Sequence, residues 1–343
     1  MLSEAVERGE SDVEGLRERF YTRIEQAFAY FERQVAAGRI SWYGVSSNNL
    51  GRDAQDREST SLAHFLAAAS RAALSENVPQ HHFAVLQCPM NLFESDVSTR
   101  PNTGPCNQKT VLELAQQSDL AVLVNRPLNA MPTSGTGMLR LAEVPLEGES
   151  GNIEDALRAV GDLEGEYRTK LVAVIPYGGK GLHPEEFFNW AEELASVRDR
   201  LHGLEHWEQI EHQMIAPHVN QVLQAIPRMV EGLAAEQWEA WRERYIPKLL
   251  TLLGILRREA AQKSRTRTQR VAAAMDPLLP ASKQRETLSR KALWVLISTP
   301  GVTCVLNGMR TLGYVEDSLG VLGWKPLENP EAFFKAVRDV TDI

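Results

Sequence analysis

The chain has 343 residues, enough for about two domains or for one large α/β barrel, so its core needs no disulfide framework. Its 37 Lys and Arg against 45 Asp and Glu give a net charge of -8, which disfavours general binding to nucleic acids. With 43% hydrophobic and 24% charged residues, the composition is that of a folded globular protein. The three cysteines lack paired spacing, which fits a reducing compartment and allows no cysteine-rich zinc site.

The first residues are acidic and lack the basic and apolar regions of a secretory signal. No stretch of eighteen residues is apolar throughout, as a membrane-spanning helix requires. We therefore expect a cytoplasmic protein that does not bind membranes.

Helices and strands alternate along much of the chain. Apolar residues spaced by three or four predict helices, and runs rich in β-branched and aromatic residues predict strands. The expected strands lie at 40–47, 83–93, 120–128 and 301–310, and the helices around them at 13–37, 59–74, 111–117, 287–298 and 311–322.

Strands that read as continuous apolar runs between helices are typical of a parallel sheet buried on both faces, in a β/α barrel or a doubly wound fold. In such folds the chemistry lies where the strands end. The residues at these ends are mostly small amides and hydroxyls, namely Ser46, Ser47, Gln87, Asn91, Asn125, Arg126 and residues 307–310.

Between residues 129 and 282 the alternation stops. We expect a strand at Leu171–Pro176 and helices from 184 to about 274, together forming an inserted subdomain. The expected division of the chain is therefore 1–128, 129–282 and 283–343.

Four segments in chain order, GRISWYGVSS, LQCPMNLFE, AVLVNRPLN and ALWVLISTPGVTCVLNGMR, resemble the C-terminal half of an aldo/keto reductase. The resemblance covers residues 38–128 and 292–322. It implies an α/β fold, a partial TIM (β/α) barrel holding strands five to eight, with the helical insertion added. It also implies an NADP-dependent oxidoreductase that exchanges a hydride between the nicotinamide and a small carbonyl compound or alcohol.

The resemblance assigns roles to the first strand ends. Ser46 matches the serine that hydrogen-bonds the nicotinamide carboxamide, and Gln87 matches the glutamine that holds the same amide. A hydroxyl and an amide can satisfy the donors and the acceptor of a carboxamide. Ser47 stands where the family usually has Asn, and Asn125 replaces an aromatic ring that stacks on the nicotinamide. Arg126 is expected to contact phosphate or substrate instead.

The last loop matches the segment around the adenosine phosphate. It contains Gly308, Met309 and Arg310, and a guanidinium there favours the 2′-phosphate of NADP(H) over NAD(H). Tyr314 and Ser318 occupy positions at which many relatives contact adenine with other residues. The alternative is a helix N-terminus with a solvated arginine.

The Asp, Tyr, Lys and His that transfer the proton in this family lie on the first four strands, and the resemblance starts after them. We therefore expect no catalytic residue in this chain and no activity of the chain alone. A half barrel leaves two open sheet edges, so self-association or pairing with a separate half is expected.

Two other functions remain open. A non-catalytic binding or assembly protein would use the helical insertion as a partner surface, around Trp207, Trp238 and Trp241. A metal hydrolase would use His202, Glu205 and His206, whose spacing matches His-x-x-Glu-His, although we expect a solvated helix and no metal there. The glycine runs at 135–137 and 178–181 are interpreted as turns, and the basic segment 257–270 as a solvated helix end.

Overall fold

The computed structural model describes residues 12–131, 137–176 and 183–340. The chain divides into two compact units, one formed by residues 1–132 and 271–343 and the other by residues 133–270. We call them the sheet unit and the helical unit and describe each by itself. We expected boundaries at 128 and 282, and the second boundary instead falls within a long helix.

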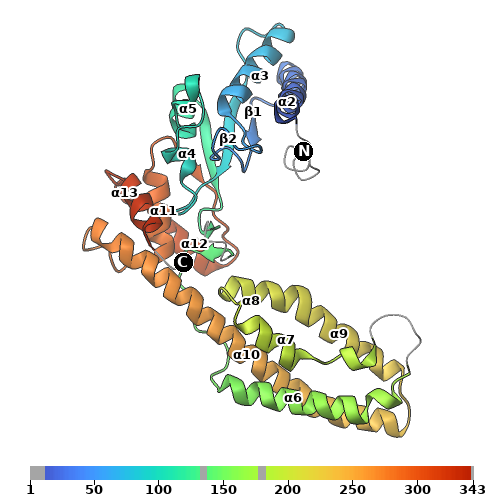
Figure 1. Ribbon diagram of the computed structural model, residues 1–343. Helices are drawn as coiled ribbons and strands as arrows, with labels where there is room; N and C mark the ends of the chain where they lie inside the picture. The colour runs from blue at the N-terminus through green and yellow to red at the C-terminus, as the bar shows by residue number, and fades with distance from the viewer. Residues whose placement is uncertain (1–11, 132–136, 177–182, 341–343) are drawn as a thin grey trace. The chain divides into compact units, whose positions relative to one another are not determined.

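The sheet unit alternates strands and helices in the predicted order (Figure 1). Its strands are β1 (Tyr43–Ser46), β2 (Phe83–Pro89), β3 (Ala121–Asn125) and β6 (Cys304–Val305), with the short strand β4 (Asn129–Ala130). Its helices are α2 (Val13–Ala36), α3 (Leu62–Ser75), α4 (Asp96–Thr99), α5 (Val111–Gln117), α11 (Leu288–Ser298), α12 (Leu312–Leu319) and α13 (Glu331–Arg338), with the turns η1 (Pro105–Asn107) and η6 (Asp276–Leu278).

The helical unit consists mainly of helices. These are α6 (Ile153–Lys170), α7 (Trp190–Arg198), α8 (Leu204–Ile210), α9 (Ala216–Ala225) and α10 (Leu233–Met275), which passes the boundary at residue 270. Shorter elements are β5 (Leu139–Arg140), η2 (Val172–Val174), η3 (Pro184–Glu186), the π-helical turn η4 (Glu211–Ile215) and η5 (Ile226–Arg228). Over the described residues, no helix combines the length and the apolar character needed to cross a bilayer.

The four main strands form one parallel sheet in the order β1-β2-β3-β6. Ser46 pairs with Gln87, Gln87 pairs with Leu123, and Leu123 pairs with Cys304, so these four residues form one row across the sheet. The prediction of a parallel α/β sheet with these strands is confirmed. That the sheet is part of a barrel stays a prediction.

Helices cover one face of the sheet. Phe28 of α2 packs on Tyr43 of β1 with ring centroids 5.0 Å apart, while α5 packs on β3 and α11 on β6. The side chains of Leu86, Val122 and Val124 on this face are fully buried. The opposite face, called the open face below, is half-buried or exposed at Gly44, Ser46, Val85, Gln87, Ala121, Leu123, Asn125 and Cys304.

Local signals place several helix ends. Thr110 caps α5 by accepting a hydrogen bond from the Glu113 N–H, and the Glu113 carboxylate accepts one from the Thr110 N–H. Thr287 caps α11 by accepting from the N–H of Arg290. After α2, Gly38 adopts a positive φ of 70°, the left-handed conformation that commonly ends a helix.

The core of the helical unit is aromatic. Trp207, Trp238 and Trp241 are only 0%, 2% and 1% exposed, and the Trp241 indole donates to the carbonyl of Leu163 at 2.8 Å. These tryptophans pack inside the unit with Tyr167, Phe188 and Tyr245. The predicted partner surface around the three tryptophans is therefore wrong, because these large aromatic side chains form the core of the helical unit.

The predicted strand at Leu171–Pro176 is also wrong. Val172–Val174 forms a 3-10 turn directly after α6, and Leu171 and Ile175 on either side of it are buried in the helical core. A short apolar run fits a buried strand and a buried helical segment equally well. Here the run continues α6 as a turn, and its flanking residues belong to the helical core.

Candidate functional site

The carboxyl end of the sheet brings Ser46 and Gln87 side by side. Ser46 is the last residue of β1 and pairs in register with Gln87 of β2. Register partners in a parallel sheet project from the same face, so both side chains lie on the open face. Ser46 is exposed and Gln87 is half-buried. Neither side chain forms a hydrogen bond with any residue that the structure describes.

Asn125 ends β3 and lies on the same face. Gln87 pairs with Leu123, and Asn125 follows two residues further along β3. The Asn125 Oδ1 atom is buried and has no hydrogen-bond partner within the described ranges. A buried acceptor without a donor costs about 1–3 kcal/mol, so this position favours a ligand that donates a hydrogen bond. The fold thus brings three predicted site residues to the carboxyl end of the sheet.

Ser47 belongs to the loop after β1. Its hydroxyl lies 2.8 Å from the Thr60 hydroxyl and accepts a hydrogen bond from the Asn49 N–H at 3.2 Å. Its own N–H donates to the carbonyl of Gln87. These bonds occupy the Ser47 side chain in shaping the loop between β1 and α3.

Arg126 is held by an ion pair and hydrogen bonds to the loop after β2. It has a positive φ of 54°, an uncommon conformation for a residue with a side chain that four other described residues share. Its guanidinium pairs with Glu94 at 2.9 Å, and the buried Asn91 amide donates to Glu94 at 2.6 Å and to the Arg126 carbonyl at 3.3 Å. The Nε atom of Arg126 is buried without a partner among the described residues.

The loop between β6 and α12 carries Gly308, Met309 and Arg310, all exposed. No ion pair or hydrogen bond joins the Arg310 guanidinium to another described residue. Thr311 caps α12 by accepting from the Tyr314 N–H at 3.3 Å. An uncommitted guanidinium next to a helix N-terminus suits an anionic ligand, because both carry positive charge.

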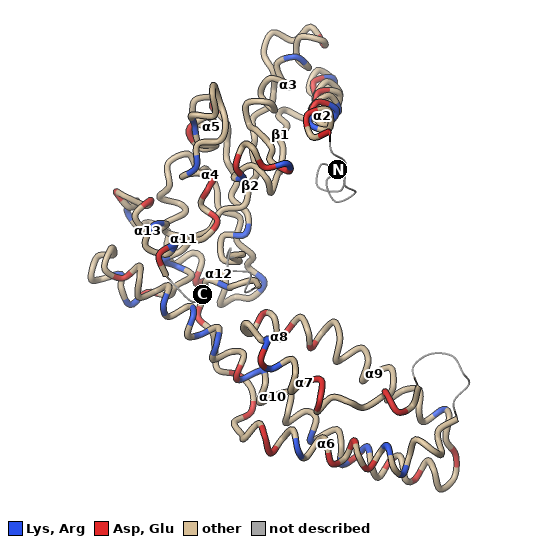
Figure 2. Tube along the Cα trace, viewed as in Figure 1, with Lys and Arg blue, Asp and Glu red and all other residues tan. Residues whose placement is uncertain are grey.

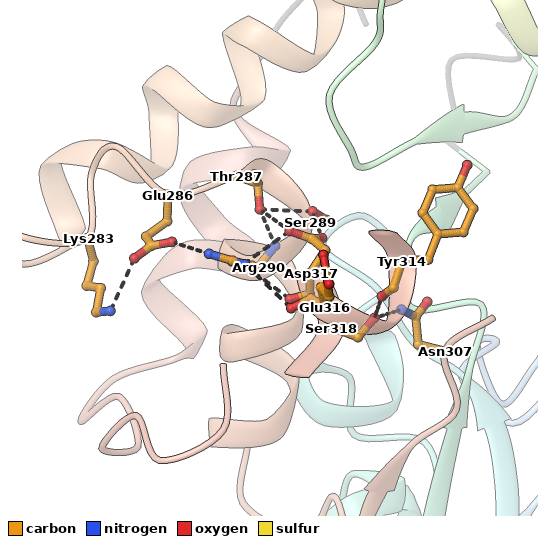
Figure 3. Close-up of polar contacts among 10 residues, drawn as sticks. All are labelled: Lys283, Glu286, Thr287, Ser289, Arg290, Asn307, Tyr314, Glu316, Asp317 and Ser318. Atoms are coloured by element: carbon orange, nitrogen blue, oxygen red, sulfur yellow. Dashed lines mark hydrogen bonds and ion pairs between the residues drawn. The ribbon is translucent and has the colours of Figure 1, made fainter. Parts of the chain in front are cut away.

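Ser318 and Tyr314 do not meet at a common site. The Ser318 hydroxyl accepts a hydrogen bond from the Asn307 amide at 2.7 Å and donates to the carbonyl of Tyr314 at 2.7 Å. Ser318 is buried, whereas Tyr314 is 47% exposed. Figure 3 shows the Tyr314 ring directed away from these contacts. Ser318 thus ties the end of β6 to α12, and its hydroxyl is committed within the protein.

A charged network that we did not predict fixes α12 against α11 (Figure 3). The Asp317 carboxylate accepts hydrogen bonds from Thr287 at 2.9 Å and from Ser289, and it pairs with the Arg290 Nε at 3.1 Å. Glu286 holds the same guanidinium at 3.0 Å. The sequence signals only the Thr287 cap, since nothing local indicates a partner thirty residues away.

Cys88 lies next to Gln87 in β2 but points to the helix-covered face. Burial raises the pKa of its thiol to about 12, so the thiol stays neutral near pH 7. Thiolate chemistry is therefore not expected beside the candidate site.

The His-x-x-Glu-His segment does not assemble a metal site. His202 and His206 stack with centroids 5.2 Å apart, but the Glu205 carboxylate accepts a hydrogen bond from Ser264 at 3.0 Å. No group of three metal-ligating side chains occurs within the described ranges. The structure thus gives the metal hydrolase hypothesis no ligand set.

The prediction that the basic segment 257–270 is a solvated helix end is wrong, because the segment lies inside α10 and Arg267 is only 7% exposed. Arg257 pairs with Glu208 and Glu211 at 2.9 and 3.1 Å, and Lys263 donates to the Leu201 carbonyl at 2.9 Å. Figure 2 shows acidic and basic residues interspersed along α6 in the same unit. In the glycine run at 135–137, only Gly137 lies among the described residues, and its φ is positive. The run at 178–181 lies outside the described residues.

Comparison with family models, with curated proteins and with solved structures finds no match for this chain in any of the three. The functional interpretation therefore depends on the geometry described above and on the resemblance noted in the sequence.

Proposed function

We propose that the sheet unit binds NADP(H) at the carboxyl ends of its strands, as the cofactor-binding half of an aldo/keto reductase-like oxidoreductase. The observation that carries the proposal is the set of Ser46, Gln87 and Asn125. These three side chains share one face and one edge of a parallel sheet, and they form no hydrogen bonds with other described residues.

The chemistry of these groups fits a nicotinamide carboxamide. That group offers one acceptor and two donors, which a hydroxyl and two side-chain amides can satisfy together. The buried Oδ1 of Asn125 needs a donor, and a carboxamide N–H supplies one. When bound, the cofactor would supply the hydride, while the protein residues orient the ring.

The fit at the other end of the cofactor is less complete. Arg310 is exposed and uncommitted, as a ligand to the 2′-phosphate requires. Ser318 is already bonded to Asn307, and Tyr314 points away from it. We therefore assign recognition at this end to Arg310 and the neighbouring backbone of Gly308 and Met309, and not to Ser318 or Tyr314.

Isothermal titration calorimetry of the full chain with NADPH and with NADH tests the proposal. We expect Gln87→Ala to weaken binding of both cofactors about tenfold, because one hydrogen bond between uncharged groups contributes roughly 1–1.5 kcal/mol to the binding free energy. We expect Arg310→Gln to weaken NADPH binding at least about tenfold and NADH binding much less, because only NADPH carries the additional phosphate.

Arg39→Gln is the matched control, since it also removes one exposed positive charge but lies before β1, at the amino end of the sheet. Equal losses of NADPH affinity in Arg39→Gln and Arg310→Gln would reduce the effect to net charge and contradict the assigned site. No binding of either cofactor at millimolar concentration would refute the proposal as a whole.

The proposal also includes that the chain by itself turns over no substrate, because no proton donor is assigned to it. Incubation with NADPH and a generic aldehyde should leave the absorbance of the reduced cofactor unchanged. Steady oxidation that is lost in Gln87→Ala would show an active enzyme and contradict this part alone.

A further inference from the structure

The open face of the sheet has the residue composition of a surface that is normally buried. Parallel sheets are normally covered on both faces, and here only one face carries helices of the sheet unit. The side chains on the open face include Val85, Leu123 and Cys304, and none of its described residues is charged. An uncharged, partly apolar face favours a partner face that is also uncharged, because an opposing charge would lose its water there.

Neither edge of the sheet carries the charged residues or prolines that usually hinder pairing, although β6 at one edge is only two residues long. Natural edge strands are blunted by Lys, by Pro or by a very short edge strand. The segment 40–46 along the β1 edge and the segment 303–307 along the β6 edge contain no charged residue and no proline. Trp42 beside the β1 edge is 62% exposed, and Leu306 beside the β6 edge is 40% exposed.

Helix α12 presents apolar side chains that no described residue covers. Leu312 and Leu319 lie seven residues apart on the helix and are 74% and 49% exposed, and Leu322, in the turn after the helix, is 69% exposed. The opposite side of the helix is fixed to α11 through Asp317. A helix that follows a parallel strand ordinarily packs across that strand and the next one, and β6 has no next strand here.

We infer that two copies of the chain associate through these surfaces, so that the two open faces meet. The free β6 edge of each copy then pairs in parallel with the β1 edge of its partner. A twofold axis along the strand direction makes both pairings at once, and two sheets of four parallel strands complete a closed barrel of eight. The α12 leucines then pack on β1 of the partner.

The open face supplies only part of the area that a stable dimer needs. Four strands of about four residues form a face of roughly 19 Å by 13 Å, or about 250 Å². A stable dimer buries about 800 Å² on each partner, so the open face alone is too small. The two edges and the α12 leucines must therefore take part, and variants of α12 as well as of β6 should weaken association.

The test is the mass of the full-length chain by light scattering and sedimentation between about 1 and 100 µM. We expect a dimer for the native chain and for the control Leu74→Lys, which adds a charge at the 78% exposed Leu74 of α3. Cys304→Lys and Leu319→Lys should each raise the dimer dissociation constant at least about tenfold, because each buries a charge in the contact. Circular dichroism checks that each variant is folded.

Hydrogen exchange of the native chain supplies a second measurement that needs no variant. Apart from Thr303 and Leu306, whose amides already donate to β3, amides of residues 303–307 should exchange more slowly at 100 µM than at 1 µM, because pairing protects the free β6 edge. A chain that stays monomeric at 100 µM overturns the inference. A dimer with unchanged affinity in both variants, or with equal exchange at both concentrations, also overturns it. Cofactor titration reports separately, so either proposal can fail without the other.

Discussion

Glu32 shows how a buried charge is accommodated at the amino end of the sheet. Its carboxylate is 1% exposed and accepts hydrogen bonds from the Tyr43 hydroxyl at 2.7 Å, the His82 N–H at 2.8 Å and the His82 Nδ1 at 2.7 Å. Burial opposes ionisation, but the bonds from His82 and Tyr43 outweigh it, and the pKa of Glu32 lies below its ordinary 4.5. Burial, and in addition the contact with Glu32, raises the pKa of Tyr43.

Glu32→Gln should destabilise the protein by about 1–3 kcal/mol at pH 7, because donors that face the carboxylate lose an acceptor. The folded pKa is lower than the unfolded one, so Glu32 stabilises the fold above about pH 4.5 and loses this effect as pH falls through the folded pKa. Urea unfolding from pH 7 to pH 3 should show the gap between variant and native chain closing at the acid end. Glu18→Gln, exposed on the same helix, should change neither stability nor its pH dependence.

At the scale of elements, α12 is positioned by side chains rather than by a large apolar contact. Its leucines face outward, and Asp317 connects it to Thr287, Ser289 and Arg290 of the α11 start. This network also orients the loop at 308–310, because that loop leads directly into α12.

Asp317→Asn should lower the free energy of unfolding by about 1–3 kcal/mol, because it removes the charge that the Arg290 guanidinium and two hydroxyls face. Thermal unfolding of the full chain measures this loss. Glu316→Gln is the matched control, because the neighbouring Glu316 is exposed and offers only its backbone carbonyl to Arg290. A similar loss in both variants would mean that helix charge, and not the network, stabilises α12.

The two units have separate cores. In the helical unit, Tyr245 donates to the buried Glu164 at 2.8 Å, and Glu164 also accepts from the N–H groups of Trp190 and Ala191. Burial raises the pKa of Glu164 although these bonds oppose the shift. In the sheet unit, Glu32 occupies its own buried cluster.

Tyr245→Phe should therefore cost about 1–3 kcal/mol independently of Glu32→Gln, and the double variant should equal the sum within about 0.5 kcal/mol. Calorimetry of the full chain measures the three variants. Tyr30→Phe, at an exposed tyrosine, should be neutral. Coupling well above 0.5 kcal/mol between Tyr245 and Glu32 would show that the two units form one cooperative core.

Much of the fold could be predicted because its signals are local. The apolar spacing of α2, the capping box of α5 and the apolar run of β3 each lie within a few residues, and the structure confirms each of these elements. The parallel pairing followed from the alternation of such segments. The candidate site could be predicted only as a set of strand ends.

The sequence by itself determined the order of strands and helices, and therefore that Ser46, Gln87 and Asn125 lie toward the same end of a parallel sheet. The strands themselves end earlier than predicted, at Ser46, Pro89 and Asn125 and not at 47, 93 and 128. Only the tertiary structure decided which polar groups stay uncommitted there. The Ser47 hydroxyl is hydrogen-bonded to the Thr60 hydroxyl, and the Ser318 hydroxyl to the Asn307 amide. The physical reason is that a polar side chain bonds to whatever the folded chain brings near it, and for Asp317 that partner is thirty residues away.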